Sequence, residues 1–185
     1  RCIGLMRDIT SAKRAHQNLV HDAVHDYLTG LPNRQLFLDR LGMVLVRSRQ
    51  ENGPKPTVLF IDIDRFKNVN GDYGIIAGDS LLKTLARRLQ RHLEAQDTLA
   101  RLGGDQFVML VSTDKPASEI AMLAERVRRS LRSPVKFQGK DIVLTGSIGH
   151  ATFAGEAALG ADELLRQAEQ AMYTAKRGGT DRVEG

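Results

Sequence analysis

The sequence contains no tryptophan and only one cysteine, and aromatic residues make up 5% of its 185 residues. A single cysteine, Cys2, cannot form an internal disulfide framework, so the composition predicts a reducing, cytoplasmic compartment. No apolar run approaches the roughly 20 residues of a membrane-spanning helix, and the first residues lack the apolar core of a signal peptide. We therefore expect no disulfide-stapled secreted domain and no membrane span in this segment.

The charge balance is moderately basic, with 27 basic and 22 acidic side chains and a net charge of +5. Many arginines gather at 87–91 and at 126–132, on segments with helical apolar spacing. Such runs are usually solvated helix faces, and the few aromatic residues do not provide a stacking platform for bases. We therefore expect no nucleic-acid partner.

The apolar spacing predicts an alternation of helices and strands. Helices are expected over 11–27, 34–49 (capped by Asn33), 79–95, 117–132 and 161–177; strands over 57–63, 135–137 and 141–145 (the last continuing towards Phe153); a hairpin over 98–111; and a strand end at Ile3–Met6. This order fits an α+β fold of the split βαβ type, an antiparallel-rich sheet with helices on one face.

Two carboxylates stand out in this predicted sheet. Asp62 interrupts an apolar strand, where an unpaired acid is costly to bury. Asp105 follows Gly103-Gly104, a dipeptide typical of a tight hairpin turn. On neighbouring strands the two could hold a Mg²⁺ together with substrate phosphates. The residues alone leave simpler readings open: Asp105 as a turn residue, Asp79 as a helix cap, and Lys67 and Lys176 as surface lysines.

Six collinear motifs then resemble a known family. They are Asp26-Tyr-Leu-Thr-Gly-Leu-Pro-Asn-Arg34, Phe60-Ile-Asp-Ile-Asp-Arg-Phe-Lys-Asn-Val-Asn70, Gly78-Asp79, Arg101-Leu-Gly-Gly-Asp105, Thr145-Gly-Ser-Ile-Gly149 and Ala171-Met-Tyr-Thr-Ala-Lys-Arg177. Together, over about 22–183, they resemble the GGDEF family of bacterial diguanylate cyclases. The resemblance implies a nucleotidyl-cyclase palm that condenses two GTP, one on each subunit of a homodimer, into cyclic di-GMP with Mg²⁺ or Mn²⁺.

The resemblance also implies roles for individual positions. Asp62, Asp105 and the backbone carbonyl of Ile63 fall in the metal-ligand slots. The GTP-binding slots hold residues for the phosphates (Phe66 and Lys67 in a turn, and Lys176), for the guanine (Asn70 and Asp79), and in or beside the signature motif (Arg101, Gly103 and Gly104).

The sequence departs from the family pattern at functionally important positions. Gln106 replaces the motif glutamate, a candidate proton acceptor, and an amide cannot act as a base at neutral pH. Gly71 and Ile75 replace an acid and a histidine near the base-reading loop. Glu94 stands where many members have the arginine of an inhibitory product site, so we predict no feedback inhibition there. Gln106 in particular predicts a cyclase activity that is reduced or lost.

The same resemblance suggests a domain organisation. Residues 1–27 resemble the end of a PAS-like sensor domain with its connecting helix, and residues 28–183 form the GGDEF domain. The tail resembles segments that lead into an EAL phosphodiesterase domain. Three functions stay open at this point: a slow cyclase, a catalytically impaired GTP-binding regulatory module, and a dimerising relay without nucleotide. The alanine-rich helix at 11–27 predicts only weak self-association.

Overall fold

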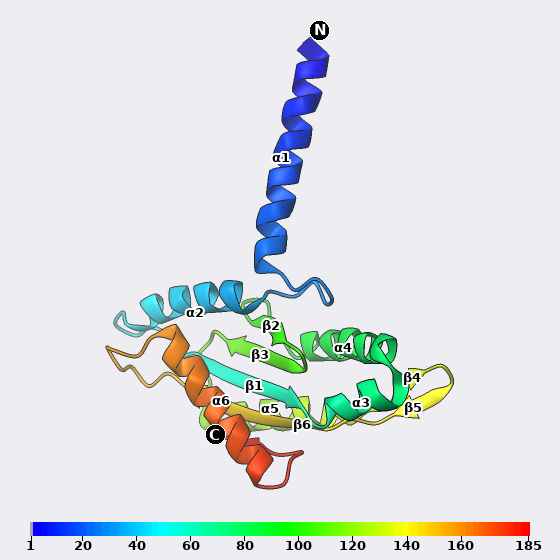
Figure 1. Ribbon diagram of the computed structural model, residues 1–185. Coiled ribbons are helices and arrows are strands. Elements are labelled where there is room, and N and C mark those ends of the chain that lie inside the picture. Colours follow the sequence, from blue (N-terminus) through cyan, green and yellow to red (C-terminus); the bar gives the residue numbers. More distant parts are fainter. Residues whose placement is uncertain (1) are drawn as a thin grey trace.

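The computed structural model describes residues 2–185, and the side chains of residues 9–185. In chain order its elements are α1 (Cys2–Val24), α2 (Arg34–Ser48), β1 (Thr57–Ile63), α3 (Phe66–Tyr73), α4 (Ile75–Gln90), β2 (Thr98–Gly103), β3 (Gln106–Val111), α5 (Ala117–Leu131), β4 (Val135–Phe137), β5 (Lys140–Ile142), β6 (Gly146–Thr152), α6 (Ala161–Arg177) and β7 (Val183–Glu184). Helix α1 projects away from the remaining elements, which pack together around the sheet (Figure 1).

The main sheet has five strands in the order β2-β3-β1-β6-β7, and β4 and β5 form a separate two-stranded sheet. β1 lies at the centre and pairs antiparallel with both β3 and β6, while β6 and β7 are parallel. The predicted antiparallel-rich α+β fold is therefore confirmed. In this register Asp62 lies opposite Gln106 on one side and Ser147 on the other.

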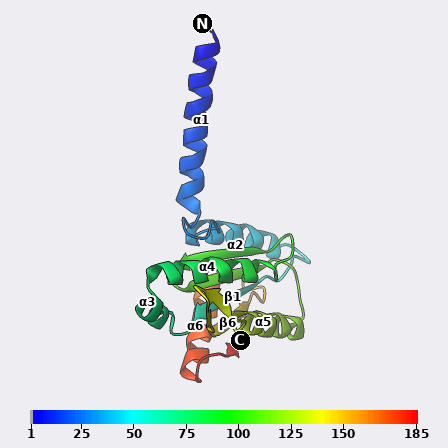
Figure 2. The same cartoon turned by 90° about the vertical axis from the view of Figure 1, so that its right-hand side faces the viewer.

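Helices cover both faces of the sheet, so the prediction of helices on one face is wrong. Alternate residues of β1 face opposite sides, as the period of two in a strand requires. Leu59 and Ile61 join a core built with α4 and α5, whereas Val58 and Phe60 join a second core built with α2 and α6. Figure 2 shows the sheet enclosed between these helices. Because β1 carries apolar side chains on both of its faces, helices must pack against each face to bury them.

The start of the chain differs from the prediction. Ile3–Met6 is part of α1 rather than a strand end, and the helix ends at Val24, before the exposed Tyr27. A helix satisfies its backbone groups internally, whereas a strand here would need a partner. Asn33 explains the turn that follows, because its amide nitrogen donates to the Ala23 carbonyl and its Oδ1 accepts from the Leu36 N–H. The predicted cap of α2 is thus confirmed.

Further boundaries shift. The predicted helix 79–95 begins and ends earlier, at Ile75 and Gln90. It is preceded by α3, which was not predicted because this segment was expected to form a turn and a base-reading loop. Gly74, at φ 89°, separates the two helices. The strand expected to run from 141 towards Phe153 is broken after Ile142, because β5 pairs with β4 outside the main sheet. Across residues 2–185 no helix is long and apolar enough to cross a membrane.

Candidate active site

The β2–β3 hairpin places Asp105 beside the end of β1. Gly103 and Gly104 have φ values of 129° and 50°, which confirms the predicted turn at glycines that tolerate positive φ. The Ile63 N–H donates to the Asp105 carbonyl over 3.1 Å, so the hairpin tip is tied directly to the residue after Asp62. The hairpin tip therefore lies beside the residue after Asp62, near enough for the charge of Asp62 to act on the Asp105 carboxyl.

Asp62 lies on the α6 side of the sheet and is almost fully buried. Its Oδ1 lies 2.7 Å from Lys176 Nζ, and its Oδ2 accepts from Gln106 Nε2 over 3.4 Å. Lys176 reaches this point because α6 packs closely on β6, where a Cβ at Gly149 would collide with the backbone of α6. The buried acid that looked costly in the sequence is thus paired.

The electrostatics couple Asp105 to the same cluster. Burial raises the pKa of Asp105, and the negative charge of Asp62 raises it further, while Lys176 and Lys67 partly offset both effects. Burial alone would lower the pKa of Lys176, but its hydrogen bond to Asp62 and the nearby carboxylates outweigh burial and raise it. The two acids and two lysines therefore act on one another.

Phe66 and Lys67 lie in the first turn of α3, and not in the turn predicted for them. Phe66 is buried in the core, whereas Lys67 is exposed. The residue before the helix, Arg65, has a left-handed φ of 54° and gives no side-chain cap. The first amide groups of α3 are therefore not occupied by a capping side chain, which suits them to an anion.

Asn70 and Asp79 come from two helices in contact, α3 and α4. Both side chains are partly buried. A Cβ at Gly78 would collide with the Asn70 amide oxygen, so this glycine allows the close approach. Asp79 lies inside α4, more than one turn after its start at Ile75, so the alternative reading of Asp79 as a helix cap is wrong.

Arg101 is buried and its guanidinium contacts other protein groups. Nη1 lies 2.8 Å from Asp26 Oδ1, while Nε and Nη2 donate to the Gly104 carbonyl over 3.2 and 2.8 Å. The residue predicted to contact GTP is thus bonded to the hairpin turn and to the segment after α1.

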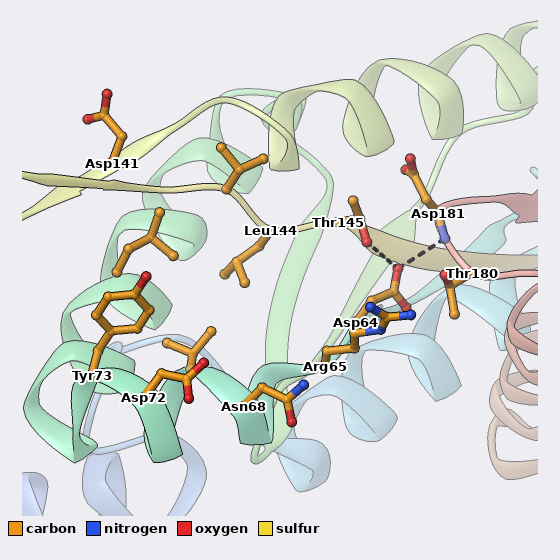
Figure 3. A pocket seen from close by; sticks show the side chains of 13 residues that line it. Asp64, Arg65, Asn68, Asp72, Tyr73, Asp141, Leu144, Thr145, Thr180 and Asp181 are labelled. Carbon is orange, nitrogen blue, oxygen red and sulfur yellow. Dashed lines mark hydrogen bonds between the residues drawn. The ribbon is translucent and has the colours of Figure 1, made fainter.

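Asp64 is a buried site residue that the sequence reasoning did not single out. Its carboxylate accepts from Thr145 Oγ1 and Ser147 Oγ, both over 2.7 Å, and from the Asp181 N–H over 3.0 Å. Two of these bonds are drawn in Figure 3. The available signal in the sequence was the position of Asp64, two residues after Asp62 and directly after the end of β1. Lys176 Nζ lies near both carboxylates, 2.7 Å from Asp62 Oδ1 and 3.8 Å from Asp64 Oδ1.

A cavity of about 480 Å³ lies next to Asp64, between α3 and the segment that joins β5 to β6 (Figure 3). Asn68 and Asp72 line it from α3, and Asp181 lines it from the tail. None of the predicted metal or GTP residues lines this cavity. The predicted site lies instead at the end of β1, with the exposed Gly103 and Gly104 at its margin.

The donor set fits a hard divalent cation that is completed by substrate. Among the described residues no group of three or more His, Cys, Asp or Glu forms a metal cage. Asp62 and Asp105 nevertheless provide two carboxylates at one strand end, and Mg²⁺ is commonly held by one or two carboxylates plus substrate phosphates. The residues present therefore suit a cation that arrives with a phosphorylated ligand.

Comparison with known proteins gives a consistent result. The family described as "Diguanylate cyclase, GGDEF domain" matches residues 23–182. MucR of Pseudomonas aeruginosa, named a bifunctional diguanylate cyclase/cyclic di-GMP phosphodiesterase, is 41% identical over 170 residues, which cover 92% of this chain and 24% of MucR. Diguanylate cyclase DgcP of the same species is 38% identical over 180 residues, which cover 94% of this chain and 26% of DgcP.

A solved structure supports the same relationship. The coiled coil and GGDEF domain of DgcB from Caulobacter crescentus, crystallised with c-di-GMP, matches with a TM-score of 0.88 and 27% identity, covering 100% of this chain and 96% of that one. The chain spans about a quarter of the length of the two curated relatives. Its sequence and fold thus agree, and the chain belongs to the GGDEF family, as a diguanylate cyclase-type domain of cyclic di-GMP signalling.

Proposed function

We propose that this domain binds GTP with Mg²⁺ or Mn²⁺ and serves as a regulatory module whose cyclase activity is strongly reduced. The observation that carries this proposal is that Asp62 and Asp105 lie near each other at one end of β1. The hydrogen bond from the Ile63 N–H to the Asp105 carbonyl holds the hairpin there. Two convergent carboxylates beside two lysines suit a cation and a polyphosphate better than a relay without ligand.

Each residue then has a defined task. Asp62, Asp105 and the Ile63 carbonyl would hold the cation, which supplies charge neutralisation for the triphosphate. Lys176 and Lys67, together with the uncapped first turn of α3 at Phe66, would bind phosphate oxygens.

The guanine and the hairpin have their own residues. Asn70 and Asp79 would read the polar edge of the base from α3 and α4. Arg101, together with Gly103 and Gly104, would shape the hairpin that lies against the ligand. Because Arg101 donates to the Gly104 carbonyl, we assign it to positioning the hairpin rather than to direct contact with GTP.

Gln106 is the reason for expecting low activity. It lies opposite Asp62 in the sheet, and its amide nitrogen points to the Asp62 carboxylate. A neutral amide donor at this place cannot accept the proton of an attacking 3′-hydroxyl, and loss of a general base typically costs about 10²- to 10⁴-fold in rate. GTP binding is affected less, because both aspartates remain.

The surrounding protein is proposed from the relatives and the motifs. Residues 1–27 would connect a PAS-like sensor to the GGDEF domain at 28–183, with an EAL-like domain beyond it. Cyclic di-GMP synthesis would require a homodimer, in which the projecting α1 is the natural contact. Within 9–24, the part of α1 whose side chains are described, the exposed large apolar residues are Ile9, Leu19 and Val20, so we expect the association to be weak.

The test is to incubate the protein at high concentration with GTP and Mg²⁺ or Mn²⁺, measure binding by calorimetry, and separate the products by chromatography. We expect GTP binding that Asp105→Ala weakens, with at most slow formation of cyclic di-GMP. Rapid turnover abolished by Asp105→Ala would overturn the regulatory reading. An absence of GTP binding with either metal would favour the relay.

A further inference from the structure

Both carboxylate oxygens of Asp62 already have donors within the protein. Lys176 Nζ lies 2.7 Å from Oδ1, and Gln106 Nε2 lies 3.4 Å from Oδ2. The Asp62 side chain is only 8% exposed, so water adds little to its solvation. The oxygens that would bind a cation are therefore the ones that these donors use.

The two donors are held by regular structure rather than by loops. Lys176 is in the last turn of α6, and α6 packs against the sheet at Gly149 so closely that a Cβ there would collide with the helix backbone. Gln106 is the direct cross-strand partner of Asp62 in the β1–β3 register. These contacts therefore belong to the resting fold of the domain.

The local charge is nearly balanced. Asp62, Asp64 and Asp105 bring three negative charges, and Lys176 and Lys67 bring two positive charges, which leaves one net negative charge. A glutamate at 106 would have made the total more negative. Cation affinity depends on the charge and number of ligands, so this arrangement is a weak site for a divalent cation alone.

Among the described residues, Asp64 is the other carboxylate that lies within ion-pair distance of Lys176, and it is a poor alternative partner. Lys176 Nζ lies 3.8 Å from Asp64 Oδ1, but that carboxylate already accepts from Thr145, Ser147 and the backbone of Asp181. Displacing Lys176 from Asp62 would leave a partly buried ammonium beside an incoming cation, which is unfavourable. A triphosphate would remove this penalty by giving Lys176 a new anionic partner.

We propose that Lys176, as an internal counter-charge, and Gln106, as a neutral hydrogen-bond donor, together occupy the Asp62 carboxylate, so that the site admits a divalent cation only together with a nucleoside triphosphate. This inference rests on the proposed function and adds the order in which the site accepts its ligands. The coupling is reciprocal: if bound nucleotide raises the affinity for the cation by some factor, bound cation raises the affinity for the nucleotide by the same factor.

The experiment measures Mn²⁺ binding to the full chain by electron paramagnetic resonance, with and without a non-hydrolysable GTP analogue. We expect Lys176→Met to bind Mn²⁺ alone about tenfold more tightly than the wild type, as loss of a 1.4 kcal/mol competing contact would give, while binding the analogue more weakly. Gln106→Leu, which frees Oδ2 without adding charge, should give a smaller gain.

Matched controls separate this effect from a general change in charge. Lys136→Met removes one exposed lysine from β4 and should leave Mn²⁺ binding unchanged. Adding Asp62→Asn to Lys176→Met should abolish the gain, which places the ion at Asp62.

The outcomes distinguish the two claims. If the wild type binds Mn²⁺ with the analogue but Lys176→Met gains nothing for Mn²⁺ alone, the counter-charge inference is overturned and the proposed function stands. If the wild type binds neither ligand in any combination, the proposed function itself fails, and the inference fails with it.

Discussion

The Asp26 carboxylate and the Arg101 guanidinium form a buried ion pair, with 2.8 Å between Oδ1 and Nη1 and exposures of 11% and 9%. Arg101 also donates to the Gly104 carbonyl, and its N–H donates to the Pro32 carbonyl. The pair therefore joins the segment that follows α1 to the hairpin carrying Asp105.

Replacing Arg101 should destabilise the domain. Arg101→Met leaves the Asp26 carboxylate buried without its charged partner, and breaking a buried pair typically costs about 3–5 kcal/mol. In urea unfolding, the free energy of unfolding of Arg101→Met should be lower than that of the wild type by about this amount. Arg91→Met, which removes an exposed arginine at the end of α4, is the control and should change stability little. Equal free energies of unfolding in the two variants would show that the Asp26–Arg101 pair does not stabilise the fold.

The same pair predicts a pH dependence of stability. Burial raises the pKa of Asp26, but hydrogen bonds from Thr29 and the charge of Arg101 outweigh burial and hold the pKa below its ordinary value. A carboxyl whose pKa is lowered in the folded state stabilises above its unfolded pKa, about 3.9, and this stabilisation is lost as the pH falls through the folded pKa.

The measurement compares Asp26→Asn with the wild type in urea unfolding between pH 7 and pH 2. The variant should be less stable at neutral pH, and the difference should shrink below about pH 4 as the wild-type carboxyl takes up a proton. Two curves that stay parallel over the whole range would contradict the assignment.

Restoring the acid at position 106 should restore catalysis. Gln106→Glu removes the amide donor from Asp62 and supplies a group able to accept a proton, so the rate of cyclic di-GMP formation should rise by about 10²- to 10⁴-fold. Chromatography of the products over time gives the rate. Gln106→Ala, which removes the amide without adding a base, should show no gain. An equal rise in both variants would mean that the amide only obstructs the site.

Cyclic di-GMP should not bind tightly at Glu94–Asp97. Glu94 forms an ion pair with Lys115 over 2.8 Å, and Asp97 accepts from the backbone N–H groups of Glu94 and Ser112. Ionised carboxylates offer a phosphodiester no hydrogen-bond donor, and the charge of Lys115 is already used by Glu94. Calorimetric titration with cyclic di-GMP should therefore give little heat, and Asp97→Ala should not alter it. Tight product binding that disappears in Asp97→Ala would refute this prediction.

Much of the fold could be predicted from the sequence because its elements have strong periodicity or clear punctuation. The apolar repeat of α6 gave both of its bounds, and Gly103-Gly104 identified the hairpin. Helix α3 was not predicted because Phe66 and Lys67 were expected in a turn and Gly71 near a loop, whereas contact with α4 stabilises a helix there. Tertiary packing here overrides local propensity.

The sequence indicated which residues belong to the candidate site, but not which of them contact one another. Asp62 was conspicuous because an acid inside an apolar strand needs a partner, yet the sequence did not identify that partner as Lys176, 114 residues away. Asp64 was hidden beside it in the same motif. Contacts between distant segments depend on how α6 crosses the sheet, which periodicity along the chain does not specify.

The most direct test is the position of the cation when a GTP analogue is bound. A crystal structure with a non-hydrolysable GTP analogue and Mn²⁺ locates the ion by its anomalous scattering. We predict the ion within about 2.0–2.3 Å of carboxylate oxygens from both Asp62 and Asp105, the usual range for a small divalent cation, with Lys176 turned from Asp62 to a phosphate. An ion bound elsewhere, such as in the cavity beside Asp64, with Lys176 still on Asp62, would contradict the account.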